Sequence, residues 1–435
     1  MGGRAVIPLR RLERLGRESR LVRGLYQWFR ALALYGRSLP DWLRWLGRRR
    51  KPVPRQPDPR SAAPLHIVMV ARHARVRELK LAHAARLAGC RVSLLADTVQ
   101  WHGVFEDHVD TFDRFINPFQ ALNAIHAMAP DVVHVLAANN NWEMLPLILY
   151  SPCPTVYDPY DCARSFILPR YQYAFFELEA ERLCLERADH ICARSLEPVY
   201  LRRKFGYRLP PTTFFPDYCW NAPVPPRAHP PGTEREFHIV YCGNVVPEDR
   251  TTAEEFGYAH YLEVTRRLTR LGLHFHIYPA KSQGDPRKYF SLYFQEAAQN
   301  PRFHFHSSLS PEALRRKLPS FDAALHISGV GIHPPAGRIT AAKAAHSTAN
   351  KLFDYLEAGL PVIIHRGRLQ RALVRHYGQA IEIEQLEEIP AALRAIRPTP
   401  AHSQPTLAAH AHRLGRMYRQ AAANTIRFAR EEEET

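Results

Sequence analysis

The order of short apolar runs and helical segments is the feature that most constrains how this chain folds. From residue 65 onward, runs that suit buried parallel strands alternate with segments that have helical periodicity. The expected strands of the first half lie at residues 65–70, 91–96, 131–136, 154–158 and 190–193. The expected helices lie around residues 78–87, 142–150, 171–188 and 196–205. This repeated β-α alternation predicts a doubly wound parallel sheet.

A proline-rich stretch separates this series from a second one. Residues 221–235 contain five prolines, so they can form neither a helix nor a central strand. The second series has expected strands at 237–243, 273–278, 302–306, 323–327 and 361–365, and expected helices at 258–271, 311–318 and 350–357. We therefore expect an α/β protein with two Rossmann-like doubly wound domains that face a cleft. The predicted boundaries are 64–220 for the first domain, 221–235 for the linker, 236–400 for the second domain, and 401–435 for C-terminal helices and an acidic tail.

The basic character of the chain is concentrated in an N-terminal extension, residues 1–63. Residues 1–60 hold sixteen Lys or Arg residues and only four acidic ones, whereas the whole chain has a formal net charge of +17. Residues 8–50 have the pattern of two amphipathic helices, and Trp42, Trp45 and clustered arginines suit a helix in the membrane interface. A helix packed on the protein's own surface, with a solvated basic face, fits the same pattern. Nucleic-acid binding is less favoured, because no nucleic-acid-binding motif accompanies the charge.

Other compositional features exclude several classes of protein. The seven cysteines are scattered and form no C-x-x-C, which indicates free thiols in a reducing, cytoplasmic location. The 23 histidines show no H-E-x-x-H or similar spacing, so the sequence predicts no metal site. The N-terminus lacks the pattern of a secretory signal, and no run of apolar residues is long enough to span a bilayer.

One segment carries most of the information about chemistry. Residues 350–363 read Asn-Lys-Leu-Phe-Asp-Tyr-Leu-Glu-Ala-Gly-Leu-Pro-Val-Ile. Asp354 lies early on the expected helix, where a carboxylate can accept two hydrogen bonds from a ribose diol. Lys351 lies one turn earlier on the same face, so it can pair with Asp354 or reach a diphosphate. Gly359 is expected to end the helix in the left-handed conformation, and Pro361 to start the next strand. An ordinary solvated helix start with a Lys–Asp pair is the alternative.

Cations near this segment are candidates for stabilising a departing diphosphate. They are Arg338, Lys343, Lys351 and Arg250. Residues 329–338 form a long Gly- and Pro-punctuated loop that leads toward the segment. The loop either faces the cleft or is a surface excursion.

The segment 350–363 resembles the N-K-L-F-E-Y-L-A-A-G-x-P-V-I motif of GT-B glycosyltransferases of the family 4 type. Shorter similarities lie at residues 131–134 (Asp-Val-Val-His), at 156–161, and at 302–306 followed by 309–314. The resemblance extends from about residue 65 to residue 423. It implies the GT-B fold and transfer of a sugar from a nucleoside-diphosphate sugar, with no separate cofactor.

The resemblance also implies roles for particular residues. Asn350, Lys351 and Asp354 would bind the donor nucleotide. Gly243 and Asn244 would lie beside the diphosphate, with Arg250 as the nearest cation and His306 in the matching strand. Lys351, Arg338 and His134 would be the catalytic set.

The chain departs from the family's pattern at three positions that the family uses. His346 stands where the family has a glutamate, Asn244 where it often has an arginine, and Leu136 where it has a second histidine. His134 also fits an ordinary buried histidine at a strand end. Asp158 and Asp161 either bind acceptor hydroxyls or cap the next turn.

The sequence therefore predicts a cytoplasmic glycosyltransferase of the hexosyltransferase type and of retaining stereochemistry. Its acceptor would be a saccharide or a lipid-linked saccharide in polysaccharide biosynthesis, and residues 1–50 would give peripheral membrane contact at the inner face. A nucleotide-sugar epimerase of the same fold is one alternative. A non-catalytic protein that binds a sugar or nucleotide is the other.

Overall fold

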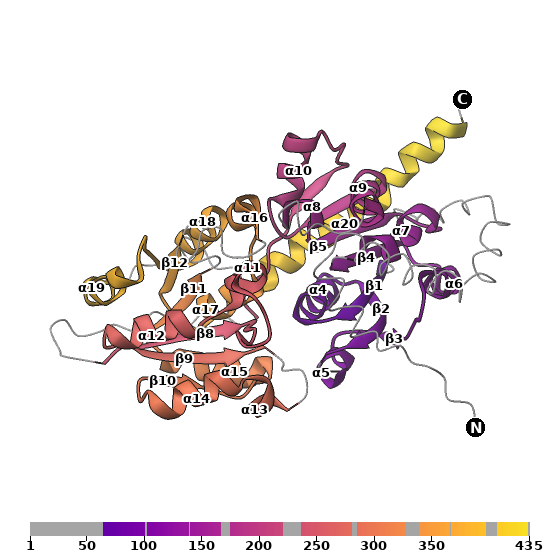
Figure 1. Cartoon of the computed structure of the whole chain (residues 1–435). Helices are drawn as coiled ribbons and strands as arrows, with labels where there is room; N and C mark the ends of the chain where they lie inside the picture. The colour runs from indigo at the N-terminus through magenta and orange to yellow at the C-terminus, as the bar shows by residue number, and fades with distance from the viewer. Residues whose placement is uncertain are drawn as a thin grey trace, which may run out of the picture. The chain divides into compact units, whose positions relative to one another are not determined.

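The computed structural model describes residues 64–100, 102–138, 140–166, 175–220, 236–280, 285–327, 339–365, 367–396 and 407–433. The N-terminal extension, the proline-rich linker and the loop 329–338, with Arg338, lie outside the described residues. The chain divides into two compact units (Figure 1). Unit 1 extends to Phe215 and includes the chain again from Ala411, and unit 2 is Pro216–His410.

Unit 1 is built on a seven-stranded parallel sheet with the strand order β3-β2-β1-β4-β5-β6-β7. The strands are β1 (His66–Ala74), β2 (Arg91–Val99), β3 (Thr111–Asp113), β4 (Val132–Ala138), β5 (Thr155–Asp161), β6 (His190–Ala193) and β7 (Thr212–Phe214). The helices are α4 (Val76–Leu87), α5 (His102–Glu106), α6 (Pro118–Met128), α7 (Asn141–Tyr150), α8 (Ala163–Phe166), α9 (Phe175–Arg187) and α10 (Glu197–Phe205).

Unit 2 is built on a six-stranded parallel sheet with the order β10-β9-β8-β11-β12-β13. The strands are β8 (His238–Gly243), β9 (His274–Pro279), β10 (Phe303–Phe305), β11 (Ala323–Ile327), β12 (Val362–His365) and β13 (Ala380–Glu382). The α-helices are α11 (Ala253–Phe256), α12 (Leu262–Arg270), α13 (Pro286–Tyr289), α14 (Ser291–Gln299), α15 (Pro311–Lys317), α16 (Ala341–His346), α17 (Asn350–Glu357), α18 (Arg368–Tyr377) and α19 (Ile389–Ala395). Short 3-10 turns lie at η2 (Gly257–Ala259), η3 (Leu318–Ser320) and η4 (Leu386–Glu388).

Apolar strands form the centre of each unit. The middle strands β1, β4 and β5 are buried along most of their length, as expected for parallel strands covered on both faces. Unit 1 and unit 2 each have their own core cluster, which includes Val135 and Tyr157 in the first and Phe275 and Ile277 in the second. Each unit therefore buries enough apolar surface to form a core of its own.

Several helices begin with a side chain that caps their first amides. The Asn117 side chain accepts hydrogen bonds from the Phe119 and Gln120 amides at the start of α6. Thr340 accepts a bond of 3.0 Å from the Lys343 amide at the start of α16. Such caps satisfy amides that lack a partner inside the helix.

The fold class predicted from the sequence is confirmed, since both units are doubly wound parallel α/β sheets. Three strands of three residues each, β3, β7 and β13, were not expected from the sequence. All three lie at a sheet edge. Edge strands are short and less apolar than central strands, so periodicity does not reveal them.

The C-terminal helix α20 (Leu407–Glu433) joins unit 1 from Ala411 onward. In Figure 1 it is the long yellow helix that ends the chain. Leu414, Met417 and Tyr418 are buried, and Gly415 lies so close to Ala88 that a Cβ atom on it would be 2.9 Å from the Ala88 Cβ. The last element of the chain is thus part of the core of the first unit.

In the part of the chain that the structure describes, no helix has both the length and the hydrophobicity that a membrane-spanning helix needs.

Candidate functional site

The carboxyl end of β8 and the first turn of α17 meet in unit 2. The Lys351 Nζ atom donates a hydrogen bond of 2.9 Å to the Tyr241 hydroxyl and lies 4.0 Å from the centre of the Tyr241 ring. Gly243 has a φ of +152°, and a Cβ atom there would be only 2.8 Å from the Lys351 ammonium. A glycine is therefore required for this close approach of strand and lysine.

A second tyrosine fixes the strand end to the helix. The Tyr355 hydroxyl accepts a bond of 2.8 Å from the Cys242 amide, and the Tyr241 hydroxyl donates one of 3.0 Å to the Asn244 carbonyl. Tyr355 is fully buried. The end of β8 is thus bonded to α17 before Gly243, and the turn after Gly243 is bonded back to Tyr241 of β8.

Helix α17 presents its N-terminus and Asp354 to the same strand end. Its N-cap is Ala349, which has no side-chain acceptor for the first helix amides. Burial, and then the charge of the Asp354 carboxylate, raise the pKa of the Cys242 thiol at the end of β8. Gly359 follows the helix with a φ of +67°, so the predicted left-handed helix end is confirmed.

His326 is a further polar group near this lysine. It occupies the carboxyl half of β11, the strand next to β8, and its side chain is buried. Neither ring nitrogen has a hydrogen-bond partner among the described residues. Burial, and then the charge on Lys351, lower the pKa of His326 to about 3, so the ring is neutral at physiological pH. A neutral buried imidazole of this kind can donate to or accept from a ligand.

The structure therefore brings Lys351, Gly243 and Tyr241 together at the end of β8. Asp354 lies one turn further along α17, and the binding roles of these residues stay predictions. Parallel sheets bind ligands beyond the carboxyl ends of their strands. An ammonium group, a helix N-terminus and a carboxylate at this edge match the parts of a nucleoside diphosphate.

Other predicted residues make different contacts. Arg250 donates to the Lys288 carbonyl at 2.8 Å and lies over the Tyr289 ring. His306 stacks on Tyr278 with ring centroids 4.2 Å apart. Asn244 is exposed in the turn after β8, and Asn350 begins α17. Diphosphate contacts by Arg250 and Asn244, and a nucleotide contact by His306, stay predictions.

Two further positions lie on α16. Lys343 is buried, and its amide is capped by Thr340. The His346 ring bonds the Ala342 carbonyl at 2.8 Å, one turn back on the same helix. The ring of His346, at the position where the glycosyltransferase motif described above has a glutamate, is thus directed at its own helix backbone.

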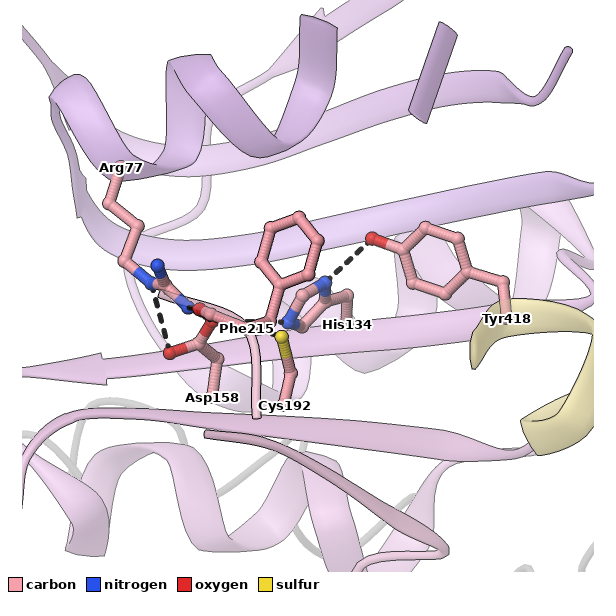
Figure 2. Close-up of polar contacts among 6 residues, drawn as sticks. All are labelled: Arg77, His134, Asp158, Cys192, Phe215 and Tyr418. Carbon is pink, nitrogen blue, oxygen red and sulfur yellow. Dashed lines mark hydrogen bonds and ion pairs between the residues drawn. The ribbon is translucent and has the colours of Figure 1, made fainter. Parts of the chain in front are cut away.

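A buried polar cluster lies in unit 1, near the middle of strands β4 and β5 (Figure 2). Arg77 from α4 donates from Nε and a terminal nitrogen to both carboxylate oxygens of Asp158 on β5, with the shortest contact 2.6 Å. The same guanidinium also bonds the Phe215 carbonyl at 3.1 Å. Burial alone would raise the pKa of Asp158, but Arg77 and His134 outweigh it and hold that pKa below its ordinary value.

His134 is fully buried in this cluster. Its Nδ1 atom is 2.8 Å from the Tyr418 hydroxyl of α20, and its Nε2 atom is 3.7 Å from Asp158. Burial lowers the pKa of His134. This environment favours the interpretation of His134 as a core histidine, since its ring is engaged by Tyr418 and lies beside the Arg77–Asp158 ion pair. Asp158 likewise belongs to a buried ion pair, which favours neither acceptor binding nor a turn cap.

His134, Asp158 and Cys192 also offer three donor atoms within 4.8 Å of one another, as a metal site would. The donor set does not fit a cation. The positive guanidinium of Arg77 already bonds both Asp158 oxygens, and a metal ion would have to displace it. The cluster is best described as a buried ion pair that ties α4, β4, β5 and α20 together.

Sequence reasoning missed Tyr241, Tyr355 and His326 as parts of the unit 2 site. Tyr355 lies inside the segment 350–363, but its apolar ring suggests only core packing. His326 does leave a signal, because it is a polar residue inside an otherwise apolar strand, near the strand's carboxyl end.

No family model matches this sequence, and no curated protein is similar to it at a significant level. Several solved structures share its fold. Sucrose-phosphate synthase from Thermosynechococcus elongatus is 15% identical with a TM-score of 0.54, over 85% of this chain and 98% of that chain. HepE of Anabaena in complex with UDP-glucose is 11% identical with a TM-score of 0.52, over 85% of this chain and all (100%) of that chain. A glycosyltransferase from Rickettsia africae is 12% identical with a TM-score of 0.52, over 83% of this chain and 94% of that chain. The chain has the GT-B fold.

Proposed function

We propose that this protein is a glycosyltransferase that takes its sugar from a nucleoside-diphosphate sugar. The observation that carries the proposal is the close approach of Lys351 to Gly243 and Tyr241 at the carboxyl end of β8, with Asp354 one turn further along α17. The shared fold supports it, because sucrose-phosphate synthase and the UDP-glucose complex of HepE have the same architecture.

In this proposal the diphosphate binds at the start of α17. The Lys351 ammonium and the α17 N-terminus stabilise negative charge on the diphosphate as the bond from the anomeric carbon to it breaks. Tyr241 holds the ammonium in place through its hydroxyl and the face of its ring. Asp354 accepts hydrogen bonds from the ribose hydroxyls.

The acceptor is proposed to be a hydroxyl of a saccharide or of a lipid-linked saccharide, and the transfer to retain the anomeric configuration. The new bond forms between the acceptor oxygen and the anomeric carbon, and the hydroxyl proton leaves with the diphosphate or the solvent. Residues 1–50 would hold the protein at an anionic membrane surface. Pelleting of the whole chain with anionic vesicles, and loss of pelleting without residues 1–60, would support that attachment.

Calorimetric titration with UDP, GDP and ADP tests the donor site. We expect one of the three to bind, and Asp354→Ala to weaken its binding by about tenfold, as loss of charge-assisted hydrogen bonds would do. Glu312→Ala, an exposed carboxylate on α15, is the matched control and leaves affinity unchanged. If no nucleotide binds, the proposal fails.

Activity assays separate the proposal from its alternatives. Incubation with the corresponding nucleotide sugar should release nucleoside diphosphate only when a saccharide acceptor is present. Interconversion of the sugar without an acceptor would indicate the epimerase-like enzyme instead. Nucleotide binding with neither reaction, across a panel of donors and acceptors, would indicate the non-catalytic protein.

A further inference from the structure

Strands β8 and β11 stand at the point where the strand order of unit 2 reverses. β9 and β10 lie on one side of β8, whereas β11, β12 and β13 lie on its other side. Doubly wound sheets bind ligands beyond the carboxyl ends of the strands at such a reversal. The parallel pairing of β8 with β11 joins Ile239 to Ala323 and Val240 to Ala324. His326 lies two residues beyond this pairing, toward the carboxyl end of β11, and so approaches the edge at which a ligand is expected.

The side chain of His326 points away from the core cluster of unit 2. Its neighbours on β11, Leu325 and Ile327, both belong to that cluster. Successive side chains of a strand point to opposite faces of the sheet, so His326 points to the other face. On β8 the same reasoning puts Cys242 on that face, because Tyr241 belongs to the core cluster. His326 and Cys242 thus share one face, on the two strands that flank the reversal.

The ring of His326 is buried without a hydrogen bond. The residue is 5% exposed, and neither ring nitrogen has a hydrogen-bond partner in the part of the chain that the structure describes. His190 in unit 1 is buried to the same degree, but its Nε2 atom lies 2.8 Å from the Thr213 hydroxyl. A buried polar group without a hydrogen bond destabilises the folded chain, and an apolar side chain of similar size would not. Folding alone therefore does not explain a histidine at this position, whereas a ligand that bonds the ring does.

The unit 2 site offers hydrogen-bond donors at this edge. The Lys351 ammonium lies at the end of β8, and the first amides of α17 have no side-chain acceptor from the N-cap residue Ala349. Burial, and then the charge of Lys351, lower the pKa of His326 to about 3, so its ring is neutral and keeps one N–H group. A neutral N–H group can bond an anion without adding a second positive charge that would repel the ammonium. This set of donors suits the oxygens of a phosphate.

We propose that His326 is a nucleotide-binding residue, and that its ring N–H donates a hydrogen bond to a diphosphate oxygen of the nucleoside-diphosphate sugar. This role rests on the function proposed above. The residue lies outside the segment 350–363 and outside the shorter similarities to the glycosyltransferase motif. The bound diphosphate supplies the hydrogen bond that the folded chain leaves unmade. His326 therefore lowers the stability of the ligand-free chain and raises its affinity for the nucleotide.

Titration of the full chain with UDP, GDP and ADP, and with the corresponding nucleosides, tests this role. His326→Leu removes both ring nitrogens and should weaken binding of the nucleoside diphosphate by about tenfold, as loss of one hydrogen bond to a charged group would do. Its affinity for the nucleoside, measured by ligand-observed NMR, should stay the same, because the nucleoside has no phosphate. His326→Gln keeps an N–H donor and should lose less diphosphate affinity than His326→Leu.

Thermal unfolding separates this binding role from a structural one. Without nucleotide, His326→Leu should unfold at the same temperature as the unaltered chain or at a higher one, since it removes an unbonded polar group from the interior. The nucleoside diphosphate should raise the unfolding temperature less in this variant. The matched control is His190→Leu, which removes a buried and hydrogen-bonded histidine from β6. It should unfold at a lower temperature and bind the nucleotide as the unaltered chain does.

Three results would overturn the role of His326. One is equal affinity of the unaltered chain and of His326→Leu for the nucleoside diphosphate, which leaves the proposed function intact. Another is an equal loss of nucleoside and nucleoside-diphosphate affinity in His326→Leu, which indicates a general distortion of the site. The last is an unaltered chain that binds no nucleotide, which refutes the proposed function and this role together.

Discussion

The ammonium group of Lys351 lies 2.9 Å from the Tyr241 hydroxyl and 4.0 Å above the ring of the same residue. The lysine is on α17 and the tyrosine on β8, more than a hundred residues earlier in the chain. This contact fixes where a positive charge sits at the edge of the unit 2 sheet. A flexible side chain is thereby held in one position, which reduces the entropy lost when an anion binds.

Lys351→Met should remove this charge and keep most of the side-chain volume. We expect nucleoside-diphosphate affinity to fall by about tenfold and turnover with a nucleotide sugar to fall by more, because charge on the departing diphosphate grows in the transition state. Titration calorimetry and steady-state kinetics measure the two effects. Lys204→Met, at an exposed position of α10, is the control and should change neither. Equal turnover in both variants would exclude a role for Lys351 in leaving-group departure.

Gly243→Ala should displace the lysine without removing it. The new Cβ would be 2.8 Å from Lys351 Nζ, and the backbone φ of +152° adds strain of about 1–3 kcal/mol. Because the lysine end is flexible, we expect it to move away and nucleotide affinity to fall. Gly272→Ala is the matched control, since its φ is +80° and no atom lies within 4 Å of the added Cβ. Both variants should lose stability in urea, but only Gly243→Ala should lose affinity.

Arg77→Met should destabilise unit 1 strongly. It leaves the Asp158 carboxylate buried without its guanidinium, and breaking a buried ion pair costs about 3–5 kcal/mol. The free energy of unfolding in urea measures the loss. Adding Asp158→Leu to Arg77→Met should recover part of it, because no unpaired charge then remains. Arg316→Met, which breaks an exposed pair with Glu312, should have little effect. A similar loss in Arg77→Met and Arg316→Met would contradict the assignment of a buried pair.

Acid should destabilise unit 2 through its histidine cluster, which is formed on strands β8 to β10 by His238, His274, His276, His304 and His306. The pKa of His276 in the folded protein is lowered from 6.5 to about 2 by burial and by neighbouring histidines, so the folded state binds fewer protons than the unfolded state. The stabilisation is complete above the unfolded pKa and is lost as pH falls through 6.5 toward the folded value. The midpoint of unfolding by urea should therefore drop between about pH 7 and about pH 4.

His276→Phe should flatten this pH dependence, because the aromatic volume stays and the titrating group is gone. His376→Gln, an exposed histidine on α18 of the same unit, provides the comparison and should follow the unaltered chain. Identical slopes for His276→Phe and the unaltered chain would rule out the cluster as the source of acid sensitivity.

The central strands could be predicted from the sequence, because a buried parallel strand appears there as a run of apolar residues. Short, polar edge strands show no such run. The expected strand at 323–327 matches β11 (Ala323–Ile327) in full. The strand β3 (Thr111–Asp113) is exposed or half-buried along its length, and no apolar pattern marks it. The packing of α20 with the unit of the first strands also escaped prediction, since helix periodicity shows an apolar face but not its partner.

The candidate site of unit 2 was predictable only in part, for a related reason. Lys351 and Asp354 share one helix turn, so their common location follows from local geometry. Tyr241 and His326 come from other strands, and their approach to Lys351 depends on the sheet order. The histidine cluster is the extreme case, because the register of three strands creates it and no linear spacing encodes it.

The assignment of α20 to unit 1 has a consequence for the order in which the chain matures on the ribosome. Tyr418, which bonds His134 in the core of unit 1, is synthesised after all of unit 2. Unit 2 is continuous in sequence and can close its core while the last helix is still being made. Synthesis of unit 1 begins before that of unit 2 and ends after it. The sheet of unit 1 therefore lacks its contacts with α20 until that helix leaves the ribosome.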